Sequence, residues 1–286
     1  MNSLPQSVNY HFWQPCNMGC KFCFAGFEDT LSVVPKGYLP KAASLALNRL
    51  LAQNFQKITY VGGEPTLCPW LFELLEDAKA LGATTMIVSN GTKLSPEYLE
   101  QLAKHLDWLT ISIDSLDPEV NRATGRTVNG KPLSAAAYIR IFQVARALGM
   151  RLKINTVVTS KNVHENISEF IKIVRPERWK IFQVLPIEGE NNGKVEEFLI
   201  ETPAFQAYIE KHLYLEQHGI KIAPEDNEDM LGSYAMVNPA GQFFDNSLGK
   251  YQKSLPILEV GIEKSWQSVH FDHQKFVERG GVYQWK

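Results

Sequence analysis

Residues 8–23 read VNYHFWQPCNMGCKFC, and this stretch decides how the rest of the chain is interpreted. An apolar run at residues 8–13 predicts a β-strand. Cys16, Cys20 and Cys23 follow this run directly, with the spacing C-x3-C-x2-C. Three thiolates on one loop can bind one iron-sulfur cube and leave its fourth iron without a protein ligand, which suits chemistry at that iron. We therefore expect a 4Fe-4S cluster on these three cysteines.

A zinc site is the alternative for the same cysteines. A structural zinc site needs four ligands and usually combines two paired C-x2-C arms. The remaining cysteine, Cys68, stands far along the chain without a partner nearby, so a histidine such as His11 would have to complete the site. In that case the chain would be a zinc-binding module without catalysis. The motifs described below favour the cluster.

Composition limits the partners of the protein. The 286 residues are 44% hydrophobic and 21% charged, which is typical of a folded globular chain. The 29 Lys and Arg residues nearly balance the 31 Asp and Glu residues, so no general basic surface favours nucleic acid. No signal peptide and no run of about 20 apolar residues is found. We predict a cytoplasmic protein without nucleic-acid or membrane partners, in which any anion is bound by a local group of cations.

Apolar runs that alternate with helical patterns predict six β/α units. Ser95 and Pro96 form a helix start, and Asn162 with Glu165 fits a reciprocal capping pair at the start of another helix. This alternation predicts a parallel sheet with helices outside it, either a doubly wound sheet or a partial barrel. The strands are expected at residues 8–13, 58–61, 85–89, 109–113, 152–158 and 179–185.

The pattern changes after about residue 199. One further helix is predicted at residues 203–217, and a hairpin at residues 233–237 and 242–245. A last helical piece is expected near residues 271–279. We predict that residues 1–200 form the main α/β unit, and that residues 201–286 form a C-terminal α+β extension that caps the active site.

A second motif, Gly62-Gly63-Glu64-Pro65, follows the second predicted strand. Glycines at such a place let backbone groups approach a ligand closely. Together with the cysteine spacing one β/α unit earlier, this motif resembles the radical S-adenosylmethionine (SAM) enzymes. The resemblance implies a partial (β/α)6 TIM-like barrel over residues 1–200. It also implies that SAM chelates the free iron of the cluster and contacts Gly62, Gly63 and Glu64.

Longer stretches resemble one branch of these enzymes, the viperin family of antiviral nucleotide-modifying enzymes, and its prokaryotic members in particular. The matching stretches are Ser7–Phe12, Ile87–Gly91, Lys153–Asn155, Arg178–Gln183, Ile187–Asn191, Ser233–Tyr234, Ile257–Gly261 and Arg279–Trp285. The resemblance implies that SAM is cleaved to a 5′-deoxyadenosyl radical, which removes the ribose 4′ hydrogen of CTP, UTP or GTP. Loss of the 3′ hydroxyl and one further reduction would then give a 3′-deoxy-3′,4′-didehydro nucleotide, a terminator of RNA chains. An electron donor such as flavodoxin or ferredoxin is implied as well.

Cations recur along two of the predicted strands. Lys153 and Asn155 share one face of the fifth strand, and Arg178 and Lys180 share one face of the sixth. If the strands are neighbours, these side chains face one space, with Lys57 at a comparable level. Spacing alone leaves two interpretations: a site for a polyanion, or side chains that reach water from strand ends. The viperin resemblance favours the first, and implies that these five residues bind the triphosphate.

The same resemblance implies further site residues. Base contacts are expected from Asn9 and His11. Tyr234 is the candidate donor of a hydrogen atom or proton near the ribose, and the alternative is a packed tyrosine with a satisfied hydroxyl. Further contacts to SAM are expected from Ser89, Asn90, Ser112, Asp114 and Arg126.

Two other activities are compatible with the same fold, the modification of a peptide and the modification of RNA. An RNA-modifying enzyme is expected to have a broad basic surface, which the near-neutral net charge of −2 does not support. A peptide-modifying enzyme often carries additional cluster-binding cysteines, and the sequence after Cys68 has none.

Overall fold

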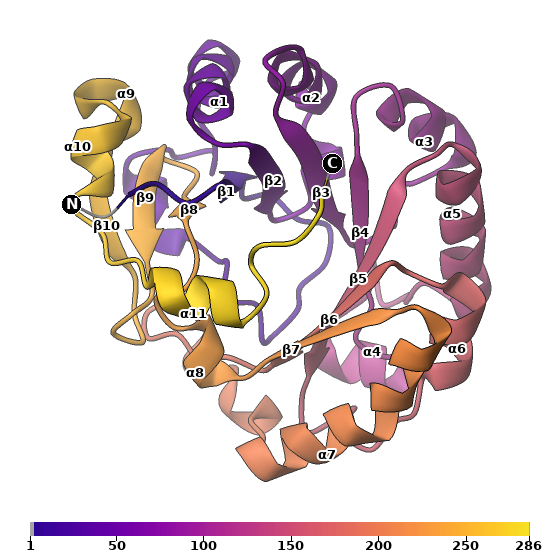
Figure 1. Cartoon of the computed structure of the whole chain (residues 1–286). Helices are drawn as coiled ribbons and strands as arrows, with labels where there is room; N and C mark the ends of the chain where they lie inside the picture. Colours follow the sequence, from indigo (N-terminus) through magenta and orange to yellow (C-terminus); the bar gives the residue numbers. More distant parts are fainter. Residues whose placement is uncertain (1–2, 286) are drawn as a thin grey trace.

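Ten strands pair in the order β10-β9-β8-β1-β2-β3-β4-β5-β6-β7 in the computed structural model, which describes residues 3–285. Neighbouring strands from β1 to β7 run parallel. Strand β8 runs parallel to β1, and β9 and β10 complete an antiparallel edge. Figure 1 shows the sheet curved, with the larger helices on its outer side. Strands β1 to β7 follow one another in sequence order without the reversal of a doubly wound sheet, so that alternative is wrong. Because the edge strands β10 and β7 are not paired with each other within the described residues, the arrangement is a partial barrel.

The strands are β1 (Ser7–Trp13), β2 (Lys57–Gly62), β3 (Thr84–Ser89), β4 (Trp108–Ser112), β5 (Arg151–Val158), β6 (Arg178–Gln183), β7 (Lys221–Glu225), β8 (Met236–Val237), β9 (Gln242–Asp245) and β10 (Gln252–Pro256). The α-helices are α1 (Lys41–Asn54), α2 (Leu71–Ala80), α3 (Pro96–Leu102), α4 (Pro118–Thr124), α5 (Ala135–Ala147), α6 (Ser168–Val174), α7 (Thr202–His212), α8 (Asn227–Met230), α9 (Ile257–Val260), α10 (Ile262–Trp266) and α11 (His273–Glu278). Short 3₁₀ turns cover Glu28–Ser32, Pro65–Leu67, Glu196–Phe198 and Leu213–His218.

Side chains alternate between the two faces of the parallel strands. In β2, Ile58 and Tyr60 are fully buried and belong to the main hydrophobic core between sheet and helices. Lys57, Thr59 and Val61 of the same strand line a cavity on the inner side of the sheet. This period of two is expected for strands, and the six strands predicted from apolar runs are confirmed, with ends that differ by at most two residues.

Two of the predicted helices follow the sequence signals closely. Ser95 caps α3 by accepting a hydrogen bond from the backbone N–H of Tyr98 at 3.3 Å, as its position before Pro96 predicts. The helix predicted at residues 203–217 is α7, which ends at His212 and continues as a 3₁₀ turn.

The capping pair predicted at Asn162 and Glu165 is wrong, because α6 begins only at Ser168. The side chain of Asn162 instead accepts a hydrogen bond from the N–H of Thr159 at 2.6 Å. It also donates to the carbonyl of Asp114 at 2.6 Å. Asn162 therefore ties the segments after β4 and β5 together, a role that asparagine can fill with the same local sequence as a helix cap.

Residues beyond 200 extend the sheet at both edges. Strand β7 pairs with β6, and the hairpin of β8 and β9 pairs with β1. The predicted hairpin is confirmed, but it lies in the sheet and not over one of its ends.

No helix among residues 3–285 combines the length and the apolar composition needed to cross a membrane.

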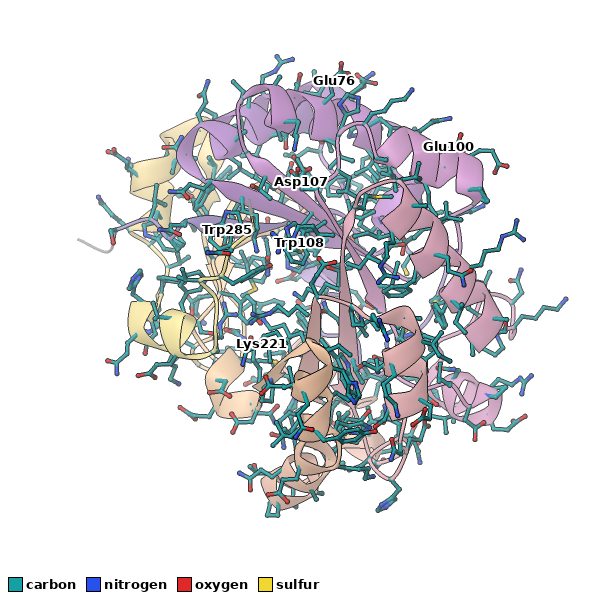
Figure 2. All side chains as sticks on the ribbon, turned by 45° about the vertical axis from the view of Figure 1, so that its right-hand side comes forward. Glu76, Glu100, Asp107, Trp108, Lys221 and Trp285 are labelled. Atoms are coloured by element: carbon teal, nitrogen blue, oxygen red, sulfur yellow. The ribbon has the colours of Figure 1, made fainter. Side chains whose placement is uncertain are left out.

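The end of the chain runs across the inner side of the curved sheet, as the yellow segment beyond α11 in Figure 1 shows. Trp285 approaches Trp108 at the start of β4 (Figure 2), and the indole N–H of Trp108 donates to the carbonyl of Trp285 at 3.0 Å. The last residues therefore meet the amino-terminal ends of the strands, opposite the end at which the cysteine loop follows β1.

Candidate active site

A cavity of about 550 Å³ lies on the inner side of the sheet. Inward-facing side chains of β1 to β6 line it, together with the cysteine loop and the end of the chain. Every site residue predicted from the sequence lines this cavity except Glu64. The fold thus brings the residues predicted for the cluster, for SAM and for the nucleotide into one place.

Two loops press together at the cysteine end of the cavity. The N–H of Gly63 donates to the carbonyl of Trp13 at 2.7 Å, and the N–H of Glu64 donates to the carbonyl of Pro15 at 3.0 Å. A Cβ atom at Gly63 would lie only 2.1 Å from the carbonyl oxygen of Gln14. Glycine is therefore required for the approach of the two loops, in addition to any approach of a ligand.

Glu64 lies behind the cavity as a buried hydrogen-bond acceptor. Its carboxylate accepts from the N–H of Thr66 at 3.1 Å, the hydroxyl of Ser89 at 2.8 Å and the N–H of Asn90 at 2.7 Å. Burial raises the pKa of Glu64, while these hydrogen bonds act in the opposite direction. The Asn90 side chain also donates to Asn17 of the cysteine loop at 2.8 Å. Glu64 thus holds the loops after β2 and β3 together, and its contact to SAM stays a prediction.

Cys16, Cys20 and Cys23 are free thiols that line the cavity. Cys16 and Cys23 are exposed residues, but their thiols lie well inside the protein, as does that of Cys20. Burial therefore raises the pKa of all three thiols, that of Cys20 to about 12. Residues 3–285 hold no group of three or more His, Cys, Asp or Glu side chains that could bind a single metal ion.

The arrangement of the cysteines fits a cube better than a zinc ion. A zinc ion needs its ligands to converge on one point, whereas each thiolate of a cube binds a different iron. The three thiols on one loop therefore fit the predicted 4Fe-4S cluster. A zinc site completed by His11 has no counterpart in the part of the chain that the structure describes.

Asp114 and Arg126 form a buried ion pair beside the cysteines. The Nε of Arg126 donates to a carboxylate oxygen of Asp114 at 2.7 Å, and a terminal N–H donates to the same oxygen. The other oxygen of Asp114 accepts from the N–H of Val157 at 2.8 Å. A guanidinium group has five N–H donors, so Arg126 keeps donors for a ligand carboxylate.

A group of cations lies toward the other end of the cavity. Lys153 and Arg178 are paired neighbours in β5 and β6, and so are Asn155 and Lys180. The two strands are therefore adjacent, as the predicted shared face requires. Lys57 at the start of β2 lines the same cavity, and none of these four cations is more than 8% exposed. The interpretation that they reach bulk water from strand ends is therefore wrong.

Burial and mutual repulsion both act on these lysines. Burial lowers the pKa of Lys57 well below its ordinary value, with further contributions from Lys153, Arg178 and Arg279. Burial, followed by repulsion from Arg178, lowers the pKa of Lys153 to about 7. Buried cations without partners are costly, so this end of the cavity is suited to an anionic ligand.

Tyr234 belongs to a buried network with Glu225 and Arg279, two residues that the sequence does not point to. The Tyr234 hydroxyl accepts from Lys180 at 2.6 Å and donates to Glu225. Arg279 lies 3.6 Å from the centre of the Tyr234 ring and donates to Glu225 at 3.1 Å, and Lys180 pairs with the same carboxylate. Burial alone would raise the pKa of Glu225, but Lys180 and Arg279 outweigh it and hold that pKa below its ordinary value.

The sequence signals for these two residues are weak. Glu225 ends β7, an edge strand that contains Pro224. Proline is confined to edge strands and strand ends, so this segment reads as irregular sequence. Arg279 lies in a stretch that carries the family resemblance without a separate chemical signal. Only the three-dimensional contacts place both residues beside Tyr234.

The end of the chain covers the cations. Lys57 donates to the hydroxyl of Tyr283 at 3.0 Å, and Arg178 donates to the carbonyl of Gly280 at 2.9 Å. Gly280 has a φ of +73°, and a Cβ atom there would lie 2.9 Å from the Arg178 guanidinium. A glycine at this position therefore lets the backbone lie directly against the cation group.

Asn9 and His11 line the cavity from β1. The ring of His11 lies edge-on to Phe27 and Phe244, with centroid distances of 5.1 and 5.5 Å. Burial lowers the pKa of His11 to about 3, so its imidazole is neutral. Its Nδ1 has no hydrogen-bond partner within residues 3–285. This nitrogen is itself buried, so the contact of His11 to a nucleotide base stays a prediction.

Comparison with known proteins identifies the family of this chain. The model of the radical SAM superfamily matches residues 10–175. An S-adenosylmethionine-dependent nucleotide dehydratase of Flammeovirga pacifica is 46% identical, over 100% of this chain and 98% of that protein. A protein of the same name from Lacinutrix mariniflava is 48% identical, and the match spans 98% of this chain but only 58% of its relative. The S-adenosylmethionine-dependent nucleotide dehydratase RSAD2 of Oncorhynchus mykiss is 34% identical over 99% of this chain and 82% of its own length.

Solved structures share the fold at low sequence identity. Streptococcus suis SuiB bound to S-adenosylmethionine matches with a TM-score of 0.71 and 18% identity, over 99% of this chain and 69% of that chain. The enzyme anSMEcpe with bound AdoMet matches with a TM-score of 0.72 and 15% identity, over 93% and 81% of the two chains. These likenesses confirm the predicted radical SAM barrel. From its superfamily match and its near-full-length relatives, the chain belongs to the radical SAM superfamily and, within it, to the family of S-adenosylmethionine-dependent nucleotide dehydratases.

Proposed function

We propose that this protein is a radical SAM enzyme that converts CTP, UTP or GTP to the 3′-deoxy-3′,4′-didehydro nucleotide. The observation that carries the proposal is that a buried group of cations and three free cysteines line one cavity. The relatives named nucleotide dehydratases support the same reaction. Because the product lacks a 3′ hydroxyl, it would terminate RNA chains, which is the basis of a role in antiviral defence.

A radical SAM protein uses a 4Fe-4S cluster and SAM, and this chain is a member of that superfamily. We propose Cys16, Cys20 and Cys23 as the ligands of the cluster. When bound, the cluster and SAM supply a 5′-deoxyadenosyl radical through one-electron cleavage of SAM. The residues proposed to hold SAM are Gly62, Gly63, Glu64, Ser89, Asn90, Ser112, Asp114 and Arg126.

The strands set the distance between the two ends of the cavity. Lys57 begins β2 and Gly62 ends it, so their Cα atoms lie about 16 Å apart at about 3.3 Å per residue. The triphosphate is proposed to bind at the amino-terminal end of the strands. Its ribose then lies between the phosphate site and the cysteines, with the 4′ hydrogen directed at the cysteine end. The proposed phosphate contacts are Lys57, Lys153, Asn155, Arg178 and Lys180.

Loss of the 3′ hydroxyl as water requires a proton, and Tyr234 is the proposed donor. Its hydroxyl already accepts a hydrogen bond from Lys180, so a proton given to the leaving group can be replaced from that ammonium. Burial lowers the pKa of Lys180 well below its ordinary value, which makes the ammonium a better acid. The phenol O–H donates to Glu225 in this structure, so it has to rotate from Glu225 toward the leaving group before it can give up its proton there.

The surroundings of the reaction follow from the same scheme. The electron needed for SAM cleavage and for the reduction after loss of water would come from a small redox protein such as flavodoxin or ferredoxin. Base contacts are assigned to Asn9 and His11.

Residues 201–286 are proposed as an extension that closes the cavity and excludes water, because an unselective radical must be kept from side reactions. We place the reaction in the cytoplasm, without nucleic acid as a partner.

A SAM cleavage assay tests this function. Anaerobically reconstituted protein receives SAM, a chemical reductant and each ribonucleoside triphosphate in turn, and the release of 5′-deoxyadenosine is measured. One of CTP, UTP and GTP is expected to stimulate the release well above the rate without nucleotide. If none does, the nucleotide function is wrong, and stimulation by a peptide or an RNA in its place would identify the class of substrate.

A double variant tests the phosphate site separately. Arg178→Ala with Lys180→Ala is expected to raise the KM for the triphosphate at least tenfold, because two buried cations are lost, while the iron content stays unchanged. Unchanged kinetics in this variant would show that the triphosphate binds elsewhere.

A further inference from the structure

The charges around the phosphate site have a consequence for the chemical form of the substrate. We infer that the cavity binds the nucleoside triphosphate free of Mg²⁺, so that lysine and arginine side chains neutralise the phosphates in place of a metal ion. This inference rests on the proposed function and specifies the substrate of the same site.

The cations form one electrostatic group with a single internal carboxylate. Lys57 is affected by Lys153, Arg178 and Arg279, and Lys180 is affected by Glu225, Arg279 and Lys153. Five side-chain cations and one carboxylate leave four positive charges when all of them are ionised. A nucleoside triphosphate carries about four negative charges near neutral pH, since the second pKa of its terminal phosphate is near 6. When all of these lysines are protonated, the metal-free triphosphate therefore matches the charge of the site.

The Mg²⁺ complex of the same nucleotide does not match it. Binding of the dication leaves about two negative charges on the nucleotide, so about two positive charges of the site would stay buried without a counterion. These cations are shielded from water, with exposed fractions of at most 9% for Lys57, Lys153, Arg178, Lys180 and Arg279. Solvent therefore cannot take over the neutralisation.

Among residues 3–285, the phosphate end of the cavity also offers no lining carboxylate to a metal ion. Nucleotide-bound Mg²⁺ is usually held by one or two protein carboxylates together with the phosphates. Among the described residues that line the cavity, the acidic ones are Glu28 and Asp114. Glu28 begins the turn after the cysteine loop, and Asp114 is paired with Arg126 at the SAM end.

Glu225 is the carboxylate that pairs directly with the described cations, and both of its oxygens are in use. Asp229, which is half-buried, acts on Arg279 through its charge without a described hydrogen bond to it. One oxygen accepts from Arg279 at 3.1 Å and pairs with Lys180. The other accepts from the hydroxyl of Tyr234. A metal ion at Glu225 would have to displace three hydrogen-bond donors that the fold already holds in place.

The protonation of Lys153 supports this charge balance. Its pKa near 7 in the absence of ligand means that part of the population is neutral at physiological pH. A tetraanion favours the protonated form, so binding of the metal-free nucleotide should take up protons from the buffer. The charged groups that act on Lys153 are Lys57, Arg178, Lys180, Glu225 and Arg279.

Magnesium titration of the complete enzyme tests the inference. Holoenzyme with SAM and reductant is assayed for 5′-deoxyadenosine release with the triphosphate that stimulates it, from excess EDTA to excess Mg²⁺. We expect full activity in EDTA. As Mg²⁺ is added, the apparent KM for total nucleotide should rise about tenfold for each tenfold fall in the fraction of the nucleotide that is free of Mg²⁺. The KM calculated for free nucleotide should stay constant. Loss of activity in EDTA that Mg²⁺ restores would overturn the inference. The visible absorbance of the cluster is followed in parallel, as a control for iron removal by the chelator.

Calorimetry without reductant gives a readout that does not depend on turnover. The same nucleotide is titrated into holoenzyme with and without Mg²⁺, in two buffers of different ionisation enthalpy. Tighter binding and net proton uptake without Mg²⁺ would support the inference, and tighter binding with Mg²⁺ would overturn it.

A charge variant and a matched control complete the test. Lys153→Gln removes one positive charge from the site, so the preference for metal-free over Mg²⁺-bound nucleotide should fall at least threefold in the calorimetric titration. Lys104→Gln removes an exposed lysine outside the cavity and should leave the preference unchanged. Equal preferences in Lys153→Gln and wild type would overturn the charge-matching argument. Failure of every triphosphate to stimulate SAM cleavage would instead contradict the proposed function itself.

Discussion

Lys153 shows at the scale of one residue how a binding site opposes the stability of the fold. Its charge is buried beside Arg178, and in the absence of ligand its pKa is lowered from the ordinary 10.5 to about 7. The unfolded chain therefore binds this proton more tightly than the folded chain. The penalty on folding is fully present below pH 7 and disappears as the pH rises from 7 toward 10.5.

Lys153→Met should stabilise the ligand-free protein, because it replaces a buried cation by an apolar side chain of similar length. We expect the free energy of unfolding to rise by about 1–4 kcal/mol in neutral buffer, and by less in alkaline buffer, as measured by denaturant unfolding. The same variant should lose most of its affinity for the triphosphate. Lys104→Met at the surface should change stability by less than about 0.5 kcal/mol. A destabilised Lys153→Met variant would contradict the account of this lysine.

Glu225→Gln should separate chemistry from binding. The variant keeps the shape of the side chain but removes the negative charge that accepts the hydrogen bond of Tyr234. We expect kcat for product formation to fall by about 10²-fold. The KM for the triphosphate should stay unchanged or decrease, because the cation group gains net positive charge and attracts the phosphates more strongly.

Tyr234→Phe provides the comparison for Glu225→Gln. If the two residues act as one unit, the double variant should be no slower than the slower single variant. Additive losses, or a large rise in KM in Glu225→Gln, would show that Glu225 organises the phosphate site and not the phenol.

Strand alternation makes part of this site predictable from sequence. Lys153, Asn155, Arg178 and Lys180 occupy alternate positions in two neighbouring strands, and the structure places them on one cavity. Glu225 follows no such pattern, because Pro224 interrupts the sequence pattern from which its strand could be predicted. A contact between residues far apart in the sequence, such as that of Glu225 with Arg279, has no local signature.

At the scale of elements, the cysteine loop depends on the loop after β2. The two backbones approach so closely that a Cβ atom at Gly63 would overlap the carbonyl oxygens of Gln14 and Pro15, at 2.1 and 2.4 Å. The loop that carries the cluster ligands is therefore shaped by a neighbouring element as well as by its own sequence.

Gly63→Ala should reduce loading of the cluster. We expect less iron per chain after anaerobic reconstitution, because the cysteine loop must shift to admit the methyl group. Gly149→Ala is the control, since that glycine has a φ of +81° but no atom within 4 Å of an added Cβ. The control should lose about 1–2 kcal/mol of stability and keep its iron. Full iron content in Gly63→Ala would contradict the proposed coupling of the loops.

Elements are predicted well where the sequence pattern is periodic. They are predicted poorly where the same side chain could either cap a helix or form hydrogen bonds between loops. Apolar runs between stretches of helical periodicity locate the six central strands. Asn162 fits a helix cap in sequence, yet its side chain bonds the segments after β4 and β5, and α6 starts six residues later. The hairpin of β8 and β9 follows from its turn residues, but its place beside β1 depends on a parallel pairing that no local signal encodes.

At the scale of the whole molecule, the cavity joins two chemically different ends. Cysteines lie at one end and buried cations at the other, separated by the length of β2. The near-zero net charge of the chain does not reveal this separation. Composition excludes a general basic surface, and it leaves the local group of cations to be found from strand positions.

Shortening the phosphate chain should weaken binding of the nucleotide stepwise. Each phosphate removed leaves buried cations without a counterion, so the diphosphate should need at least tenfold more nucleotide than the triphosphate for half-maximal 5′-deoxyadenosine release. The nucleoside without phosphates should give no stimulation. Equal stimulation by the nucleoside would mean that the cations do not bind the substrate.

Deuterium transfer tests the central claim most directly. A triphosphate that stimulates SAM cleavage is synthesised with deuterium at the ribose 4′ carbon, and the released 5′-deoxyadenosine is analysed by mass spectrometry. The account predicts that 5′-deoxyadenosine gains one deuterium, and that the nucleotide product has lost the 4′ deuterium and the 3′ hydroxyl, which together make up the elements of water. Unlabelled 5′-deoxyadenosine from the labelled nucleotide would contradict it.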